Sequence, residues 1–428
     1  MWDSRRRLRY NEAGQRGSNP LPISPASADQ VSADQARRRA IGFLNWAHAL
    51  DHFVILIFPT VVIGLEAAYG RSYSELIALG TASFVAFGVF SLPAGWLADH
   101  WSRRNMMAAF YIGCGVSLAG AALAPNLIAL AAALFALGMF ASIYHPVGMA
   151  MLIETAATRG RTLAFNGVCG NLGAALAAGI TAALAWWLGW RGAFLVPALL
   201  CVLTGIAYLA LVPDDRHKAG KRGTVADVVL SPKAAVLFFG IYIVISATSG
   251  LTFNTISIAL PKIVDERLGV SLLAVGGLTT AVFLCGAVAQ IAIGRLVERF
   301  APTHLFAIVV GLQLLGIFWS AQASGPLLLL ALALSMAAIY AQVTVGDLVM
   351  ARYTADAWRG RAYAVRYFLT FVASGAAVSA IALLHRSGGF DLVLIATGAL
   401  TVITFVGVAA ITVLVSDAES QQAAQPAE

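Results

Sequence analysis

Long apolar stretches alternate with short polar segments along most of this chain, and each stretch is about as long as a membrane-spanning helix. A helix that crosses a bilayer needs roughly 20 apolar residues, whereas the strands of a membrane β-barrel alternate apolar and polar positions over about ten. The pattern therefore predicts an all-α integral membrane protein with twelve spanning helices. They are expected near residues 41–65, 74–98, 105–124, 127–152, 162–188, 190–212, 233–260, 271–297, 303–322, 325–350, 361–384 and 389–415.

The longest polar break inside this array, residues 213–232, separates six predicted spans from the next six. We therefore expect two six-helix bundles, 41–212 and 233–415, joined by a cytoplasmic linker over 213–232. Residues 1–40 contain eight arginines and no apolar segment, which predicts a disordered basic cytoplasmic tail. Residues 416–428 are expected to form a second cytoplasmic tail.

Short motifs recur at nearly the same spacing in the two bundles. The sequence Arg-Gly-Arg at 159–161, before the fifth span, reappears 200 residues later at 359–361. Pro59, late in the first span, corresponds in the same way to Pro261 in the seventh. Such repeats predict a duplicated six-helix unit with two pseudo-symmetric halves. Transporters built in this way bind their solute between the halves, near the middle of the bilayer.

The composition excludes an ordinary soluble protein. Hydrophobic residues make up 59% of the chain and charged residues only 11%, with a mean hydropathy of +0.80, whereas soluble domains are about a quarter charged. With both termini inside, the cytoplasmic segments hold 22 of the 28 Lys and Arg residues and the outer loops hold five. This bias predicts a multi-pass protein of the inner (plasma) membrane with both termini in the cytoplasm. The net charge of +7 is then expected to meet membrane lipid rather than nucleic acid.

The segment after the second predicted span reads Gly95-Trp-Leu-Ala-Asp99-His-Trp-Ser-Arg103-Arg104. It resembles the signature loop between helices two and three of the major facilitator superfamily, and the resemblance covers residues 41–415. It implies the twelve-helix fold of that family and a monomeric transporter that works by alternating access. It also implies a gating role for Gly95, Asp99, Arg103 and Arg104. In that role Asp99 would meet Arg103 or the start of the eleventh helix, and the alternative is that the two arginines only set topology.

Two further segments are similar to fosmidomycin-resistance-type members of the superfamily. They are His48-Ala-Leu-Asp51-His52 in the first span and Ser142-Ile-Tyr144-His145-Pro146 in the fourth. This similarity implies that the solute is a drug-like or anionic small molecule and that it is exported.

Asp51 lies about ten residues into the first span, roughly 15 Å from its cytoplasmic end at 1.5 Å per residue. A charge inside the bilayer is costly, so Asp51 is a candidate functional residue. His48 and His52 lie within one helical turn of it, and His145 precedes Pro146 in the fourth span. We predict that Asp51, His48, His52 and His145 couple transport to protons, because imidazoles titrate near neutral pH. The alternatives are an Asp–His pair that only joins helices and a His145 that only satisfies the backbone that Pro146 disrupts.

Other polar side chains inside the spans are candidates for contact with a small-molecule solute. Asp347 and Arg366 lie toward the cytoplasmic ends of neighbouring spans, where they form a static ion pair or Arg366 binds an anionic group. Intramembrane amides either join helices or contact a ligand. The predicted solute-binding residues are Asp51, Tyr144, His145, Asn166, Asn171, Asn254, Tyr340, Asp347 and Arg366.

The sequence lacks the common motifs of hydrolases and ATPases. It contains no HExxH, GxSxG or GxxxxGK[ST], and its four cysteines show no CxxC spacing. We therefore expect no enzymatic activity, no catalytic residue, no cofactor and no metal ligand. The energy for transport must then come from an ion gradient or from the gradient of the solute itself. Two other functions stay open, a membrane redox protein with histidine-ligated haem and a receptor or scaffold that transports nothing.

Overall fold

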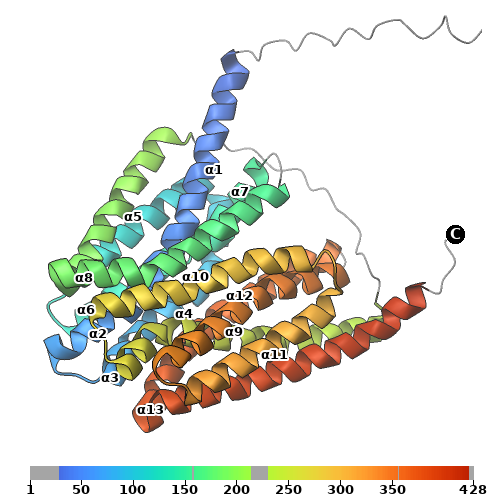
Figure 1. The fold of residues 1–428 in the computed structure, drawn as a ribbon. Helices are drawn as coiled ribbons and strands as arrows, with labels where there is room; N and C mark the ends of the chain where they lie inside the picture. Colours follow the sequence, from blue (N-terminus) through green and yellow to red (C-terminus); the bar gives the residue numbers. More distant parts are fainter. Residues whose placement is uncertain (1–27, 157–158, 214–229, 355, 424–428) are drawn as a thin grey trace, which may run out of the picture.

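The computed structural model describes residues 28–156, 159–213, 230–354 and 356–423. This part of the chain is helical, with short connections (Figure 1). The helices are α1 (Ala28–Ile55), α2 (Ile57–Tyr69), α3 (Tyr73–Ile77), η1 (Ala78–Gly80), α4 (Thr81–His100), α5 (Arg103–Ala122), α6 (Leu127–Ala141), η2 (Tyr144–Gly148), α7 (Met149–Thr155), α8 (Arg159–Leu211), α9 (Pro232–Leu268), α10 (Leu272–Leu296), α11 (Pro302–Gln322), α12 (Gly325–Tyr353) and α13 (Asp356–Ala423).

Two of these helices are long enough to cross a bilayer twice. Among the described residues ten helical stretches have the length and apolar character of a membrane span, and two of them, Thr162–Leu211 and Phe368–Ser416, contain 50 and 49 residues. Each is interrupted by a glycine with positive φ, Gly189 at 71° and Gly389 at 62°. Residues other than glycine rarely adopt this backbone conformation. Counting these two stretches twice gives the twelve crossings that the sequence predicts.

Proline residues explain two further irregularities. A proline removes a backbone hydrogen bond and its ring clashes with the carbonyl four residues earlier. Pro59 accordingly lies four residues after Ile55, where α1 ends, and Leu56 has non-helical φ and ψ of −94° and 1°. Pro146 lies inside η2, which is a π-helical turn. Such turns in membrane helices are often found at functional sites.

The boundaries predicted for the two terminal tails differ from the structure. We expected residues 1–40 to form a disordered tail, but α1 already begins at Ala28. Residues 28–40 are rich in Ala, Gln and Arg, which favour helix. The helix α13 likewise continues to Ala423, past the expected end of the last span. The rest of the N-terminal tail, residues 214–229 of the expected linker and residues 424–428 lie outside the described residues.

The helices form two groups, α1–α8 and α9–α13, coloured blue to green and yellow to red in Figure 1. The two groups meet where α2 contacts α9 and α3 contacts α13, and they spread apart toward the opposite end. They also contact each other along α8 with α10 and along α4 with α13. At Gly88 in α4 an added Cβ would lie 3.0 Å from the backbone of Phe371 in α13. The middle of the molecule is therefore an interface between the two groups.

Candidate functional site

The side chain of Asp51 is completely buried in the middle of the first crossing. The nearest basic group is His145, whose Nε2 lies 3.3 Å from Asp51 Oδ2. His145 projects from η2, where the π-helical turn widens the helix next to Pro146. Among the described residues, no donor reaches either carboxylate oxygen with hydrogen-bond geometry. Asp51 is therefore a buried acidic group that only a neighbouring imidazole approaches.

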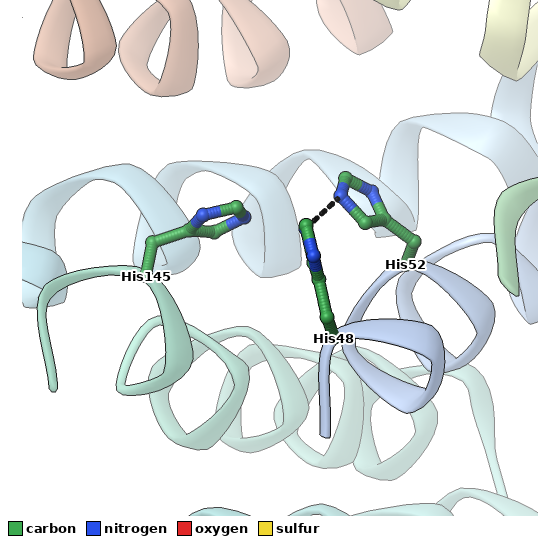
Figure 2. A group of neighbouring side chains, drawn as sticks. All are labelled: His48, His52 and His145. Atoms are coloured by element: carbon green, nitrogen blue, oxygen red, sulfur yellow. Dashed lines mark hydrogen bonds between the residues drawn. The ribbon is translucent and has the colours of Figure 1, made fainter. Parts of the chain in front are cut away.

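His48 and His52 lie beside this pair, one helical turn apart on α1 (Figure 2). The Nδ1–H of His48 donates to the backbone carbonyl of Asn166, 2.8 Å away. In the neutral ring Nε2 is then an acceptor, and it faces His52 Nε2 at 3.2 Å. The ring of His145 is 5.5 Å from His48 and 5.6 Å from His52, measured between centroids. The structure thus brings together all four residues that the sequence singled out for proton coupling.

Tyr144 and Asn166 contact His48 and each other, and they connect the histidine cluster to α8. The Tyr144 ring stacks on His48 with centroids 4.8 Å apart, and its hydroxyl donates to Asn166 Oδ1 at 3.0 Å. Asn166 Nδ2 in turn donates to Asn45 Oδ1 at 3.0 Å. Both Tyr144 and Asn166 are fully buried, so in this conformation they hold α1, η2 and α8 together. Asn45 was not anticipated, because an amide inside an apolar span gives no hint of its partner.

The cluster lies at the interface between the two groups of helices. The ring of His145 is 5.0 Å from Phe371 of α13 and 6.1 Å from Phe87 of α4. Phe87 and Phe371 contact each other edge to face, with centroids 5.1 Å apart. Any movement of α4 against α13 therefore changes the surroundings of His145.

Three of the other expected solute-binding residues join helices in this structure. Asn171 of α8 donates to Gln290 of α10, which links the two groups. Asn254 donates to the carbonyl of Gly250 at 2.8 Å in its own helix and to that of Thr370 at 3.3 Å.

The third of these residues, Tyr340, is buried and packs against Gly286 and Phe253. Asn171 thus lies where α8 contacts α10, and Asn254 lies where α9 contacts α13. Tyr340 lies where α12 contacts α10.

Asp347 and Arg366 form the ion pair that the sequence suggested as one alternative. Arg366 also donates to the carbonyl of Val343 at 3.3 Å. The pair belongs to the second group of helices, where Arg366 lines an apolar cavity of about 290 Å³ together with Tyr242 and Met350. It is thus separate from the histidine cluster, which lies on α1 and η2.

The charged side chains of the expected gating loop form ion pairs and hydrogen bonds with neighbouring helices and with each other. Asp99 accepts from Arg103 at 2.7 Å, and Arg103 pairs with Glu154 at the end of α7. Arg104 donates to the carbonyls of Leu209 and Val212 at the C-terminal end of α8, where a cation also complements the helix dipole.

Gly95 lies against Pro146, because an added Cβ would be 3.4 Å from the proline Cβ. Of the two partners expected for Asp99, the structure places Arg103 beside it. The side chains at the start of the eleventh crossing lie outside the described residues.

A second charged network, which the sequence analysis missed, joins the two groups at the opposite end. Lys262 of α9 is nearly buried and pairs with Glu66 of α2 and with Asp265, the latter at 2.8 Å. His385 of α13 bridges Glu266 and Ser74, at 3.1 and 2.9 Å. Lys262 is one of the five Lys and Arg residues that the sequence places in outer loops. The signal available in the sequence was that Lys262 directly follows Pro261 at the end of an apolar run.

We expect Gly170→Ala to disturb the histidine cluster without unfolding the protein. An added Cβ at Gly170 would lie 2.5 Å from His48 Nε2, so the ring has to leave its present position beside His52. Solute flux driven by a pH gradient should fall, while the melting temperature changes little because a side chain can move at low cost. The matched control is Gly167→Ala on the same helix, where an added Cβ meets nothing within 4 Å. Equal flux in the two variants would contradict the prediction.

The haem alternative does not fit this geometry. A bis-histidine haem needs two ring nitrogens on opposite faces of a porphyrin. His48 and His52 face each other at 3.2 Å, which leaves no room for a porphyrin plane between them. The ring of His145 stands nearly perpendicular to both, at interplanar angles of 87° and 79° and centroid distances of 5.5 and 5.6 Å.

Comparisons with known proteins agree with the arrangement of helices. The sequence profile of the Major Facilitator Superfamily matches residues 41–248 and 242–428. The "Multidrug resistance protein B homolog" of Mycobacterium tuberculosis is 25% identical over 243 residues, 53% of this chain and 44% of the relative. The "Probable L-galactonate transporter" of Escherichia coli is 23% identical over 204 residues, 47% of this chain and 45% of the relative. The chain thus spans less than half the length of these curated relatives.

A solved structure has the same fold. It is the inward-facing, unoccupied crystal structure of a bacterial homolog to the human lysosomal transporter Spinster. It aligns with a TM-score of 0.69 over 90% of this chain and 95% of that chain, at 13% sequence identity.

Proposed function

This chain belongs to the major facilitator superfamily, and we propose that it moves a small organic solute across the membrane by proton-coupled secondary transport. It is a multi-pass membrane protein, and the fold and the relatives are those of transporters rather than enzymes. We place it in the plasma membrane as a monomer with both termini in the cytoplasm. The observation that carries the coupling is the buried carboxylate of Asp51 at the interface of the two groups, with His145 as its one basic neighbour among the described residues.

Alternating access supplies the mechanism. In the conformation described, the two groups are joined at the end that holds Lys262 and spread apart at the other. With the termini in the cytoplasm, this is an inward-facing state in which the cluster exchanges protons with the cytoplasmic side. When the groups rock about their interface, Phe87 and Phe371 shift against His145 and the cluster faces outward. Gly95, Asp99, Arg103 and Arg104 then hold the cytoplasmic end closed, which is the gating role expected from the sequence.

The class of solute follows from the relatives and from the charges near the interface. Relatives are named for multidrug resistance and for transport of the acid L-galactonate. We therefore propose a drug-like or anionic organic solute that is exported, in line with the fosmidomycin-resistance-type resemblance. Arg366 is a second cation available to an anionic solute once its pairing with Asp347 loosens.

Reconstitution tests the proposal directly. The full chain is placed in proteoliposomes with a chelator on both sides, a pH gradient is imposed, and organic acids and antibiotics are screened for flux. We expect at least one solute to move against its own gradient, and a protonophore to stop it. Flux that follows only the solute gradient and ignores the protonophore would disprove the coupling. Saturable solute binding without any flux would favour the receptor alternative.

A further inference from the structure

Ring nitrogens of His48, His52 and His145 face one another at the spacing of metal ligands (Figure 2). One nitrogen from each ring lies within 4.8 Å of the other two. The two Nε2 atoms of His48 and His52 are 3.2 Å apart. Two ligands of a tetrahedral zinc ion, each about 2.05 Å from the metal, are about 3.3 Å apart. One edge of a tetrahedral site is thus already formed, and the nitrogen of His145 lies within 4.8 Å of both other ligand atoms.

The opposite nitrogen of the His48 ring has a partner of the kind that metal-bound histidines use. A ligating imidazole usually hydrogen-bonds through its other nitrogen to a backbone carbonyl or a carboxylate, which fixes the ring and its tautomer. His48 does so through Nδ1 and the carbonyl of Asn166, 2.8 Å away. The contact with Asn166 leaves His48 Nε2 available to an ion. His145 Nε2 lies 3.3 Å from Asp51 Oδ2, so the carboxylate stands beside the third ring.

The buried carboxylate of Asp51 also favours a bound cation. Asp51 is completely buried, and among the residues described neither of its oxygens accepts a hydrogen bond. An isolated carboxylate in such surroundings is strongly destabilised. A bound divalent ion next to His145 would compensate this charge.

We propose that His48, His52 and His145 form a binding site for a divalent transition-metal ion, with Asp51 as the carboxylate behind His145. Imidazole ligands suit Zn²⁺, Ni²⁺ and Cu²⁺, whereas Mg²⁺ and Ca²⁺ prefer oxygen ligands. Three protein ligands leave the fourth position of a tetrahedral ion open to water or to an oxygen atom of a solute. The sequence had suggested no metal ligand, because residues of α1 and η2 meet only in the folded chain.

Bound metal would tie α1 to η2 and would compete with protons for the same imidazoles. The proposal goes beyond transport and does not rest on it, since the ion binds whether or not the cluster couples flux to protons.

The test measures binding on the purified full chain, without a polyhistidine tag and after treatment with a chelator. Zn²⁺ is titrated by calorimetry and by competition with a chromophoric chelator, and the melting temperature is recorded with and without Zn²⁺. We expect one Zn²⁺ per chain, a higher melting temperature with Zn²⁺, and no comparable effect of Mg²⁺. His52→Gln and His145→Gln should each weaken binding by about 100-fold or more, the upper end of what loss of an outer-shell partner costs.

His304→Gln is the matched control, because His304 is exposed on α11, away from α1 and η2. Gly170→Ala keeps all the ligands but displaces the His48 ring, so it should also weaken binding. Variants that melt like the wild type without metal show that folding is intact. Absence of Zn²⁺ binding by the wild type, or equal binding by His52→Gln and His304→Gln, would overturn the proposal. Proton-driven flux in chelator is measured separately, so each proposal can fail alone.

Discussion

Replacing Asp51 with asparagine is expected to abolish solute flux driven by a pH gradient and to leave the protein folded. Asparagine has nearly the same shape, but it carries no charge and takes up no proton. The carboxylate accepts no hydrogen bond among the described residues, so its removal relieves a buried charge and should not lower the melting temperature. Exchange of labelled for unlabelled solute should persist, because exchange requires no net movement of protons.

Proteoliposomes with the wild type and with Asp51→Asn give both measurements, gradient-driven flux and exchange. Asp34→Asn is the matched control, since Asp34 lies on the same helix in an exposed pair with Arg37. Unchanged gradient-driven flux in Asp51→Asn would make Asp51 a structural residue. The search for the coupling group would then move to His145 and to the Asp347–Arg366 pair.

Replacing Lys262 with methionine is expected to open the joined end of the molecule. The Lys262 side chain is only 7% exposed and is held by Glu66 and Asp265. Methionine keeps the apolar stem and removes the charge, so the carboxylates are left together without their cation. Removing one partner of a largely buried ion pair is destabilising, because the remaining charges keep their desolvation cost without compensation. Because Glu66 and Lys262 belong to different groups of helices, we expect this cost to favour the state in which the groups separate.

A disulfide reporter measures this opening. Thr81 Oγ1 and Ser379 Oγ lie 3.3 Å apart at the same end and belong to different groups. Cysteines at these two positions, in a chain without its native cysteines, should form a disulfide readily, and Lys262→Met should reduce its yield. Arg71→Met is the control, because Arg71 forms an exposed pair with Glu75 beside this end. An equal disulfide yield and an equal melting temperature in Lys262→Met and Arg71→Met would refute the prediction.

Much of the fold could be predicted because a bilayer leaves the chain few choices. Backbone polar groups inside a membrane have to be satisfied within a helix, so the length of each apolar stretch determines a crossing. The interruptions of the helices near Pro59 and at Gly189 also have a local cause, because proline and glycine change the backbone conformation close to their own positions. The expected tail was less accurate, because the Ala- and Arg-rich residues after Ala28 continue α1. A polar composition alone does not prevent helix formation.

The candidate site could be predicted only where its residues share one helix. His48, Asp51 and His52 are close together because an α-helix places residues one turn apart on a common face. The spacing of residues along one helix does not predict which residue of a neighbouring helix they will contact. The sequence therefore left open whether Asn166, Asn171 and Asn254 contact a solute or join helices, and in the structure their amides bond to other helices.

By itself the sequence determined the membrane class, the twelve crossings, the family and the acidic residue in the middle of the first crossing. Only the tertiary structure decided that His145 approaches Asp51, that three imidazoles converge, and that Lys262 joins the two groups of helices. The physical reason is one of range. Hydropathy and helical periodicity act over a few residues of chain, whereas these contacts join residues that are far apart in sequence and depend on how whole helices pack.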